Sequence, residues 1–233
     1  MNTDSGFSSK SAKPIYDITK FTHLDYPDHL ACIIWFAGCN MRCDYCYNKD
    51  IVFAKNGAYS LDDALAFLET RRSLLDGVVL SGGEASLQEL IPFCKAIKKL
   101  GFAIKLDTNG TNPELVKELI ALELLDYIAL DYKAPKEKFQ AITHSRNYDA
   151  FNETLTFLIK TGFDFEVRTT LHADLLNEDD INAIIQDLQQ KSYNGTYYIQ
   201  EFRVTDENIG NLQKPKKSFE KPLLLDDINI VWR

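Results

Sequence analysis

Three cysteines stand close together in the chain, at Cys39, Cys43 and Cys46. Thiolates at this C-x3-C-x2-C spacing can hold three irons of a [4Fe–4S] cube and leave the fourth iron open, whereas an electron-transfer cluster normally has four cysteine ligands. Structural zinc also takes four protein ligands, and no further Cys or His lies close by in the sequence. The spacing therefore predicts a catalytic cluster with one iron free to bind a ligand.

A scaffold that positions these cysteines is visible in the rest of the sequence. Short apolar runs alternate with amphipathic helical segments, as in parallel sheets covered on both faces. Such β/α units are right-handed, and six of them are too few for a closed eight-unit barrel. We therefore expect a single α/β domain with parallel strands, built as a partial (β/α)6 TIM-like barrel. The expected strands are residues 31–36, 77–80, 103–106, 127–130, 165–170 and 197–202.

Several residues mark where the helices begin and end. Asn112 followed by Pro113 is a helix start, and Gly101 is a natural residue just beyond a helix end. Ser86 and Glu89 have the spacing of a capping box, which predicts that the helix ending at Gly101 begins there.

Unusual polar residues follow all six expected strands, which is where the active sites of barrel enzymes lie. The paired glycines Gly82 and Gly83 would let main chain approach a ligand closely, and Glu84 would bind an amino group. Lys133 or Arg168 would bind a carboxylate.

Other strand-end residues suit the remaining parts of a nucleoside-like ligand. Asp107, Asn109 or Asp131 would bind a ribose, and Tyr45 or Phe202 would contact a flat base. S-adenosylmethionine has all of these groups, and its amine and carboxylate would complete the open iron. Gln200 and Glu201 point to opposite faces of their strand, and the sequence leaves open which lines the site. The candidate cofactor-binding residues are Tyr45, Gly82, Gly83, Glu84, Asp107, Asn109, Asp131, Lys133, Arg168 and Gln200, with Lys133 also a catalytic candidate.

The three-cysteine motif, with Tyr45 before its last cysteine, resembles the signature of the radical S-adenosylmethionine (SAM) superfamily. The segment Gly82-Gly83-Glu84 is similar to the second motif of that family. The resemblance implies that Cys39, Cys43 and Cys46 ligate a [4Fe–4S] cluster. It further implies an oxidoreductase that cleaves SAM reductively to a 5′-deoxyadenosyl radical, which abstracts hydrogen from a substrate.

Within the superfamily, the chain resembles the compact activating proteins of anaerobic ribonucleoside-triphosphate reductases. This resemblance implies that the substrate is a glycine of a partner glycyl-radical enzyme and that the electron donor is a flavodoxin or ferredoxin. Tyr47 and Ala85 depart from that type, which usually has His and Pro there, but neither departure removes a cluster ligand. The matching segments are residues 23–27, 36–40, 75–84, 105–110, 126–135 and 168–170.

Two other functions remain as alternatives. A radical SAM enzyme acting on a small molecule, such as a 7-carboxy-7-deazaguanine synthase, would carry extra polar or metal-binding groups inside the barrel, and we see no such surplus. A non-catalytic iron–sulfur carrier would not need the polar strand ends. The remaining cysteines, Cys32 and Cys94, lie among apolar residues and are expected in the core.

The composition restricts the classes of partner and the cellular location that we expect. The 233 residues carry a formal net charge of −8 without a Lys/Arg-rich stripe, which disfavours nucleic acid. We find no apolar run of membrane-spanning length and no signal-peptide pattern. We therefore expect a cytoplasmic protein without membrane partners. We expect residues 1–20 to form a flexible tail, 21–203 the radical SAM core domain, and 204–233 an extension packing on or near the barrel.

Overall fold

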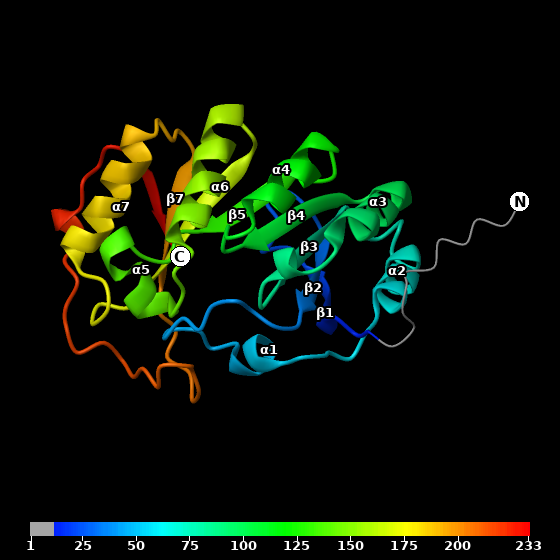
Figure 1. Ribbon diagram of the computed structural model, residues 1–233, viewed down its shortest axis with the longest axis horizontal. Helices are drawn as coiled ribbons and strands as arrows, with labels where there is room; N and C mark the ends of the chain where they lie inside the picture. The colour runs from blue at the N-terminus through cyan, green and yellow to red at the C-terminus, as the bar shows by residue number, and fades with distance from the viewer. Residues whose placement is uncertain (1–11) are drawn as a thin grey trace, which may run out of the picture.

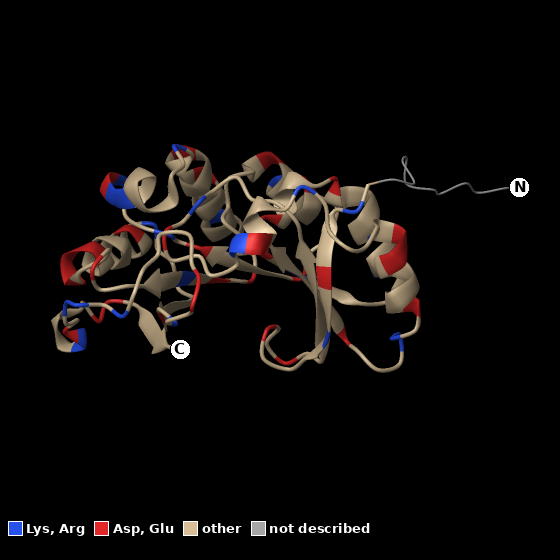
Figure 2. Ribbon diagram, turned by 90° about the horizontal axis from the view of Figure 1, so that it is seen from below, with Lys and Arg blue, Asp and Glu red and all other residues tan. Residues whose placement is uncertain are grey.

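The computed structural model describes residues 12–233, which form one eight-stranded sheet with the strands in sequence order. Strand β1 runs antiparallel to β2, and each later strand runs parallel to its neighbour. The first and last strands are not paired with each other, so the sheet curves as an open partial barrel (Figure 1, Figure 2). The strands are β1 (Ile15–Thr22), β2 (Ala31–Phe36), β3 (Gly77–Gly82), β4 (Ala103–Thr108), β5 (Tyr127–Asp131), β6 (Phe165–Leu171), β7 (Thr196–Glu201) and β8 (Asn229–Trp232).

The helices gather on one face of the sheet, which leaves the other face for the site (Figure 2). Side chains alternate across each strand. On β4, Ile104 and Leu106 are buried in the main hydrophobic core, whereas Lys105 and Asp107 line cavities on the concave face. The helices are α1 (Lys49–Phe53), α2 (Leu61–Glu69), α3 (Leu90–Leu100), α4 (Pro113–Ala121), α5 (Lys136–Thr143), α6 (Tyr148–Thr161) and α7 (Glu178–Gln190), with single 3-10 turns η1 (Ala85–Leu87) and η2 (Lys221–Leu223).

The predicted architecture is confirmed, because strands β2 to β7 correspond to the six expected strands. Two edge strands were not predicted. Strand β1 overlaps the expected flexible tail of residues 1–20, so that boundary is wrong; residues 1–11 lie outside the described part. Polar, exposed residues such as Asp17 and Lys20 obscure β1 in the sequence, but a strand at a sheet edge needs little apolar surface to pair.

The C-terminal segment, residues 204–233, lies against the barrel. Its last strand, β8, pairs in parallel with β7, with Thr196 opposite Asn229. The main chain of Ile209 and Gly210 donates hydrogen bonds to the segment that carries the cysteines. The segment therefore adds an edge to the sheet and also contacts the candidate site.

The helix-end predictions have mixed outcomes. Asn112 caps α4 by accepting a hydrogen bond from the N–H of Leu115, and Gly101 ends α3 in the left-handed conformation. The predicted capping box at Ser86 is wrong, because Ser86 lies in η1 and α3 begins at Leu90. The N–H of Ser86 is instead taken by the carboxylate of Glu84.

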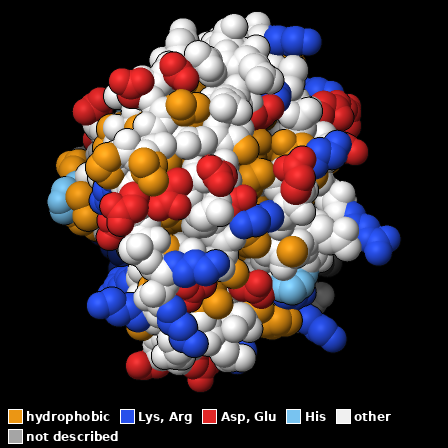
Figure 3. Space-filling model, turned by 90° about the vertical axis from the view of Figure 1, so that its left-hand side faces the viewer, with side chains coloured by type: hydrophobic (Ala, Val, Ile, Leu, Met, Phe, Trp, Pro, Cys, Tyr) orange, Lys and Arg blue, Asp and Glu red, His pale blue; other side chains and the backbone are white. Residues whose placement is uncertain are grey.

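On the side of the molecule that bears α7, acidic, basic and hydrophobic side chains all reach the surface (Figure 3). Among residues 12–233, the structure has no helix with the length and apolar character needed to span a membrane.

Candidate active site

A cavity of about 420 Å³ lies on the concave face at the carboxyl ends of the parallel strands, within the size range of cofactor pockets. The structure places every predicted site residue on its wall. These residues are Cys39, Cys43, Tyr45, Cys46, Gly82, Gly83, Glu84, Asp107, Asn109, Asp131, Lys133, Arg168 and Gln200. The residues that the sequence analysis grouped by chemistry are therefore also grouped in space.

The cysteine loop, residues 39–46, is held by main-chain hydrogen bonds from two distant segments. The N–H groups of Arg42 and Asp44 donate to carbonyls at the end of α5, at 2.9 and 3.0 Å. On the other side, Ile209 and Gly210 of the C-terminal segment donate to the carbonyls of Cys46 and Asp44, at 3.0 and 2.8 Å. The loop is thus fixed in place without relying on the cysteine side chains.

The donor set of this loop fits an iron–sulfur cluster. Burial raises the pKa of Cys39 to about 11 and that of Cys43 to about 12, so cluster assembly must displace protons from these thiols. Soft thiolate donors select iron–sulfur clusters and zinc over hard cations. Within residues 12–233, no three His, Cys, Asp or Glu side chains are arranged to hold a single metal ion.

The paired glycines allow a close contact within the protein that the sequence alone does not reveal. A Cβ on Gly83 would lie 2.0 Å from the carbonyl oxygen of Gly38, and one on Gly82 would lie 2.3 Å from the nitrogen of Phe36. The N–H of Gly83 donates to Phe36 O, and that of Glu84 to Gly38 O, both at 2.9 Å. The glycines therefore allow the end of β3 to approach the chain that enters the cysteine loop, and both also line the cavity.

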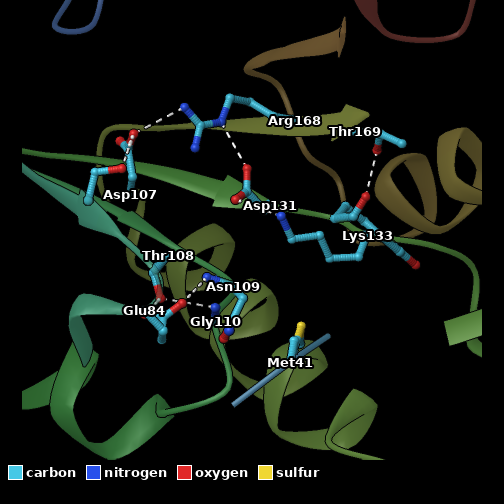
Figure 4. A network of polar contacts seen from close by, with 12 residues as sticks. Met41, Glu84, Asp107, Thr108, Asn109, Gly110, Asp131, Lys133, Arg168 and Thr169 are labelled. Carbon is cyan, nitrogen blue, oxygen red and sulfur yellow. Dashed lines mark hydrogen bonds and ion pairs between the residues drawn. The ribbon is translucent and has the colours of Figure 1, made fainter. Parts of the chain in front are cut away.

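The Glu84 carboxylate is buried and fully engaged within the protein (Figure 4). Its Oε1 accepts hydrogen bonds from Thr108 Oγ1 at 2.7 Å and from Ser86 N at 3.2 Å, and its Oε2 accepts one from Asn109 N at 2.7 Å. Burial raises the pKa of Glu84, although these hydrogen bonds oppose the shift. Glu84 thus holds the end of β4 against β3, and it also lines the cavity; its contact with a ligand amine stays a prediction.

Asn109 connects the same strand end to the cysteine loop. Its side-chain amide donates to Asn40 Oδ1 at 2.8 Å, and its oxygen accepts from Thr111 Oγ1 at 2.7 Å. Asn40 in turn donates to Thr111 Oγ1 at 2.7 Å. Asn109 therefore links the end of β4 to Asn40, the residue that follows Cys39, and its contact with a ribose stays a prediction.

Alternating charges cross the strand ends of β4, β5 and β6 (Figure 4). Arg168 donates to Asp131 Oδ1 at 3.0 Å and to Asp107 Oδ2 at 3.4 Å. Lys133 Nζ lies 3.0 Å from Asp131 Oδ2, and Lys105 Nζ lies 2.5 Å from Asp107 Oδ1. Arg168 Nη1 also lies 3.9 Å from Glu166 Oε1, so three cations face three carboxylates. Lys133 still has N–H donors free to hold an anionic group such as a carboxylate.

The ionisation of this group is set by its neighbours. Burial opposes charge on Asp131 and Lys133, but Arg168 and Lys133 lower the pKa of Asp131. Asp131 and the other anionic neighbours raise the pKa of Lys133 well above its usual value. Both side chains are therefore charged at neutral pH.

Two further residues resolve points that the sequence left open. Gln200 and Glu201 both line the cavity, but the Glu201 side chain is 64% exposed and pairs with Lys221 at 2.8 Å. Gln200 is therefore the more enclosed of the two. Tyr45 is buried, and its ring centroid lies 5.9 Å from Lys133 Nζ.

Sequence reasoning missed a second cavity, of about 450 Å³, that adjoins the first. Asp25, Arg168, Gln200 and Arg233 line both cavities. Two of its charged lining residues could have been found from strand alternation, in which residues two apart share a face. Lys105 lies two residues before Asp107, and Glu166 lies two residues before Arg168. The lining residues are His23, Leu24, Asp25, Pro27, Lys105, Glu166, Arg168, Gln200 and Arg233.

Known proteins share sequence with this chain over different lengths. A provisionally named glycyl-radical enzyme activating enzyme of Methanocaldococcus jannaschii is 31% identical over 211 residues, which cover 86% of both chains. The pyruvate formate-lyase 1-activating enzyme of Escherichia coli is 38% identical over 111 residues, which cover 43% of this chain and 44% of that protein. A 7-carboxy-7-deazaguanine synthase of Rhodospirillum rubrum is 40% identical over 78 residues, 32% of each.

The fold is shared with solved structures as well. Streptococcus suis SuiB bound to S-adenosylmethionine superposes with a TM-score of 0.63 at 12% identity, over 86% of this chain and 51% of that chain. The match thus covers about half the length of that structure and less than half the length of the pyruvate formate-lyase 1-activating enzyme.

The family itself follows from a match along most of the barrel. The model of the radical SAM superfamily matches residues 33–188, more than half of the 233 residues. Enzymes of this family use a [4Fe–4S] cluster and S-adenosylmethionine, for which the cavity described above has a suitable donor set and charge. The cysteine loop, the charged strand ends and the open barrel agree with that match. The chain belongs to the radical SAM superfamily of enzymes.

Proposed function

We propose that this enzyme activates a glycyl-radical protein, with anaerobic ribonucleoside-triphosphate reductase as the partner. The observation that carries the proposal is the 31% identity to a glycyl-radical enzyme activating enzyme over 86% of both chains. The family match over residues 33–188 includes the cysteine loop and the ends of strands β2 to β6.

In this proposal, Cys39, Cys43 and Cys46 ligate the cluster. When bound, cluster and S-adenosylmethionine supply a 5′-deoxyadenosyl radical, which takes a hydrogen atom from the Cα of a glycine in the partner. Lys133 and Arg168 hold the cofactor carboxylate by charge-assisted hydrogen bonds. The other proposed cofactor-binding residues are Tyr45, Gly82, Gly83, Glu84, Asp107, Asn109, Asp131 and Gln200.

The open side of the barrel supports a polypeptide substrate. Strand β1 pairs with β2 and strand β8 with β7, so each leaves one edge of the sheet without a strand partner. Both cavities are bordered by residues near these edges, Asp25 after β1 and Arg233 after β8. A loop of another protein can approach such an edge in an extended conformation.

Electrons would come from a flavodoxin or ferredoxin. Tyr47, which directly follows Cys46, is 55% exposed, so the cysteine loop approaches the surface and a protein donor can dock near the cluster. We place the reaction in the cytoplasm, where thiols remain reduced.

Electron paramagnetic resonance tests this proposal. The reconstituted enzyme is incubated anaerobically with reductant, S-adenosylmethionine and the anaerobic reductase of the same organism. A glycyl-radical doublet that requires all components is expected. Formation of 5′-deoxyadenosine without any doublet would contradict the proposed partner.

A second candidate is a radical SAM enzyme with a free small molecule as substrate, such as a 7-carboxy-7-deazaguanine synthase. The second cavity supports it, since its charged lining is the polar surplus that the sequence analysis did not find. The similarity to such a synthase extends over only 32% of this chain, however. Turnover of a free heterocyclic acid in place of the doublet would favour this candidate.

A further inference from the structure

The second cavity contains two buried charges whose bonding capacity is only partly used. Lys105 is 1% exposed and Glu166 is 2% exposed, and both line the cavity. Buried ionised groups are costly unless they are well paired and hydrogen-bonded. The hydrogen-bond donors and acceptors that these two side chains leave unused therefore indicate what the cavity binds.

Glu166 has weak partners for a buried carboxylate. Its Oε2 accepts one hydrogen bond, from Arg233 Nη2 at 3.5 Å, and its Oε1 lies 3.9 Å from Arg168 Nη1. By contrast, the buried carboxylate of Glu84 accepts three hydrogen bonds. Glu166 thus has acceptor sites left for a donor that enters the cavity.

Lys105 offers the complementary group. The structure gives its ammonium one hydrogen bond, to Asp107 Oδ1 at 2.5 Å, while an ammonium can donate three. Lys105 on β4 and Glu166 on β6, the strands on either side of β5, thus offer a donor and an acceptor to one cavity. They match the C=O and N–H groups that a peptide main chain carries. A polypeptide main chain satisfies both groups at once.

The rim of the cavity favours a polypeptide over a small ligand. Leu24 lines the cavity and is 78% exposed, and Phe21, three residues earlier, is 54% exposed. On the other edge of the sheet, Val231 of β8 is 38% exposed. Exposed apolar side chains beside a polar cavity are typical of a protein contact surface.

We propose that the second cavity binds the main chain of the glycine-bearing loop of the partner. Glu166 accepts a hydrogen bond from a peptide N–H of that loop, Lys105 donates to a peptide carbonyl, and Leu24 packs on the chain outside. Arg168 and Gln200 line both cavities, so the glycine Cα is presented toward the cofactor between them. This inference rests on the proposed function.

The test uses a fluorescent synthetic peptide that contains the radical-site glycine of the anaerobic reductase. Its affinity for the full chain is measured by anisotropy in the presence of S-adenosylmethionine. Glu166→Gln and Leu24→Ala are expected to weaken peptide binding about tenfold and about threefold, in line with one lost charged hydrogen bond and one lost apolar contact. Glu118→Gln and Leu122→Ala, exposed on and just after α4 away from the cavities, are the matched controls.

Kinetics with the intact reductase provide a second measurement. In Glu166→Gln we expect the KM for the reductase to rise and the yield of glycyl radical per 5′-deoxyadenosine to fall. A purely structural role would not change this ratio. Affinity for S-adenosylmethionine is measured on the same samples, so that damage to the cofactor cavity is recognised; Leu24→Ala, at an exposed position, keeps the test valid if Glu166→Gln folds poorly.

The outcomes separate the two proposals. Wild-type radical formation together with unchanged peptide affinity and KM in both variants would overturn the inference and leave the proposed function intact. Failure of the wild-type enzyme to form any glycyl radical would overturn the proposed function and the inference with it.

Discussion

The two ends of the concave face differ in how their polar groups are satisfied. At the cofactor end, Glu84 and Asn109 are closed into short hydrogen bonds with neighbouring strands and with the cysteine loop. In the second cavity, Glu166 and Lys105 are equally buried but have long or few partners. The first arrangement maintains a fixed geometry, whereas the second resembles a binding site whose ligand supplies the missing contacts.

This difference separates residues that build the site from residues that recognise a substrate. The Gly-Gly-Glu segment belongs to the first kind, since its glycines contact Phe36 and Gly38 and its carboxylate holds β4. Lys105 and Glu166 belong to the second kind. Natural proteins often give up stability at functional sites. We therefore expect Lys105 and Glu166 to contribute less to the free energy of unfolding than Glu84 does.

The largest effect is expected from the cluster ligands. Cys43→Ala should abolish cluster assembly and S-adenosylmethionine cleavage, because two cysteines cannot hold the cube. Iron and sulfide content and 5′-deoxyadenosine formation are the measurements. Cys94→Ala, at a buried cysteine of the core, should retain both; cleavage by Cys43→Ala at the wild-type rate would refute the ligand assignment.

Steric substitution tests the fixed end of the comparison. Gly83→Ala should lower the free energy of unfolding by about 3 kcal/mol, because its Cβ meets a main-chain oxygen at 2.0 Å. Gly101→Ala is the control, since Gly101 has a φ of +92° but open space around it, and should cost about 1 kcal/mol. Equal losses in denaturant titrations would show that the contact with Gly38 contributes nothing.

Two buried glutamates give the sharpest form of the comparison. Glu84→Gln should cost about 2 kcal/mol of stability, because at least one buried donor loses its acceptor. Glu166→Gln should cost less than about 1 kcal/mol, because a single long hydrogen bond is at stake. Thermal unfolding of both variants is the measurement, and a larger loss for Glu166→Gln would remove the distinction drawn between the two ends.

The smallest effect is expected from pH. The pKa of Lys133 is raised well above its usual value, with Asp131 the main cause against burial. A raised lysine pKa means that its charge is retained below the unfolded value and is lost only as pH rises through the folded value. The contribution of Lys133, taken as the ratio of S-adenosylmethionine affinities of wild type and Lys133→Met, should therefore stay constant between about pH 7 and pH 9, because titration of the ligand's own amine affects both proteins. A steep fall of this ratio in the window would contradict the charge assigned to Lys133.

Sequence periodicity predicted the parallel strands because their apolar runs are nearly continuous. It missed β1, whose residues such as Asp17 are polar and whose pairing depends on a free edge of β2. The predicted site residues share one cavity because strand ends meet there. The contacts of Glu84 with Thr108 and Asn109, and of Gly83 with Phe36, could not be predicted, since a list of residue types does not tell which polar groups the protein itself pairs.

Deuterium transfer tests the central claim most directly. The anaerobic reductase is prepared with glycine deuterated at Cα and is incubated with the enzyme, reductant and S-adenosylmethionine. The account predicts one deuterium in the 5′-deoxyadenosine formed, because a Cα–D bond of glycine breaks as a C5′–D bond forms. Unlabelled 5′-deoxyadenosine in the presence of the deuterated partner would contradict hydrogen abstraction from a partner glycine.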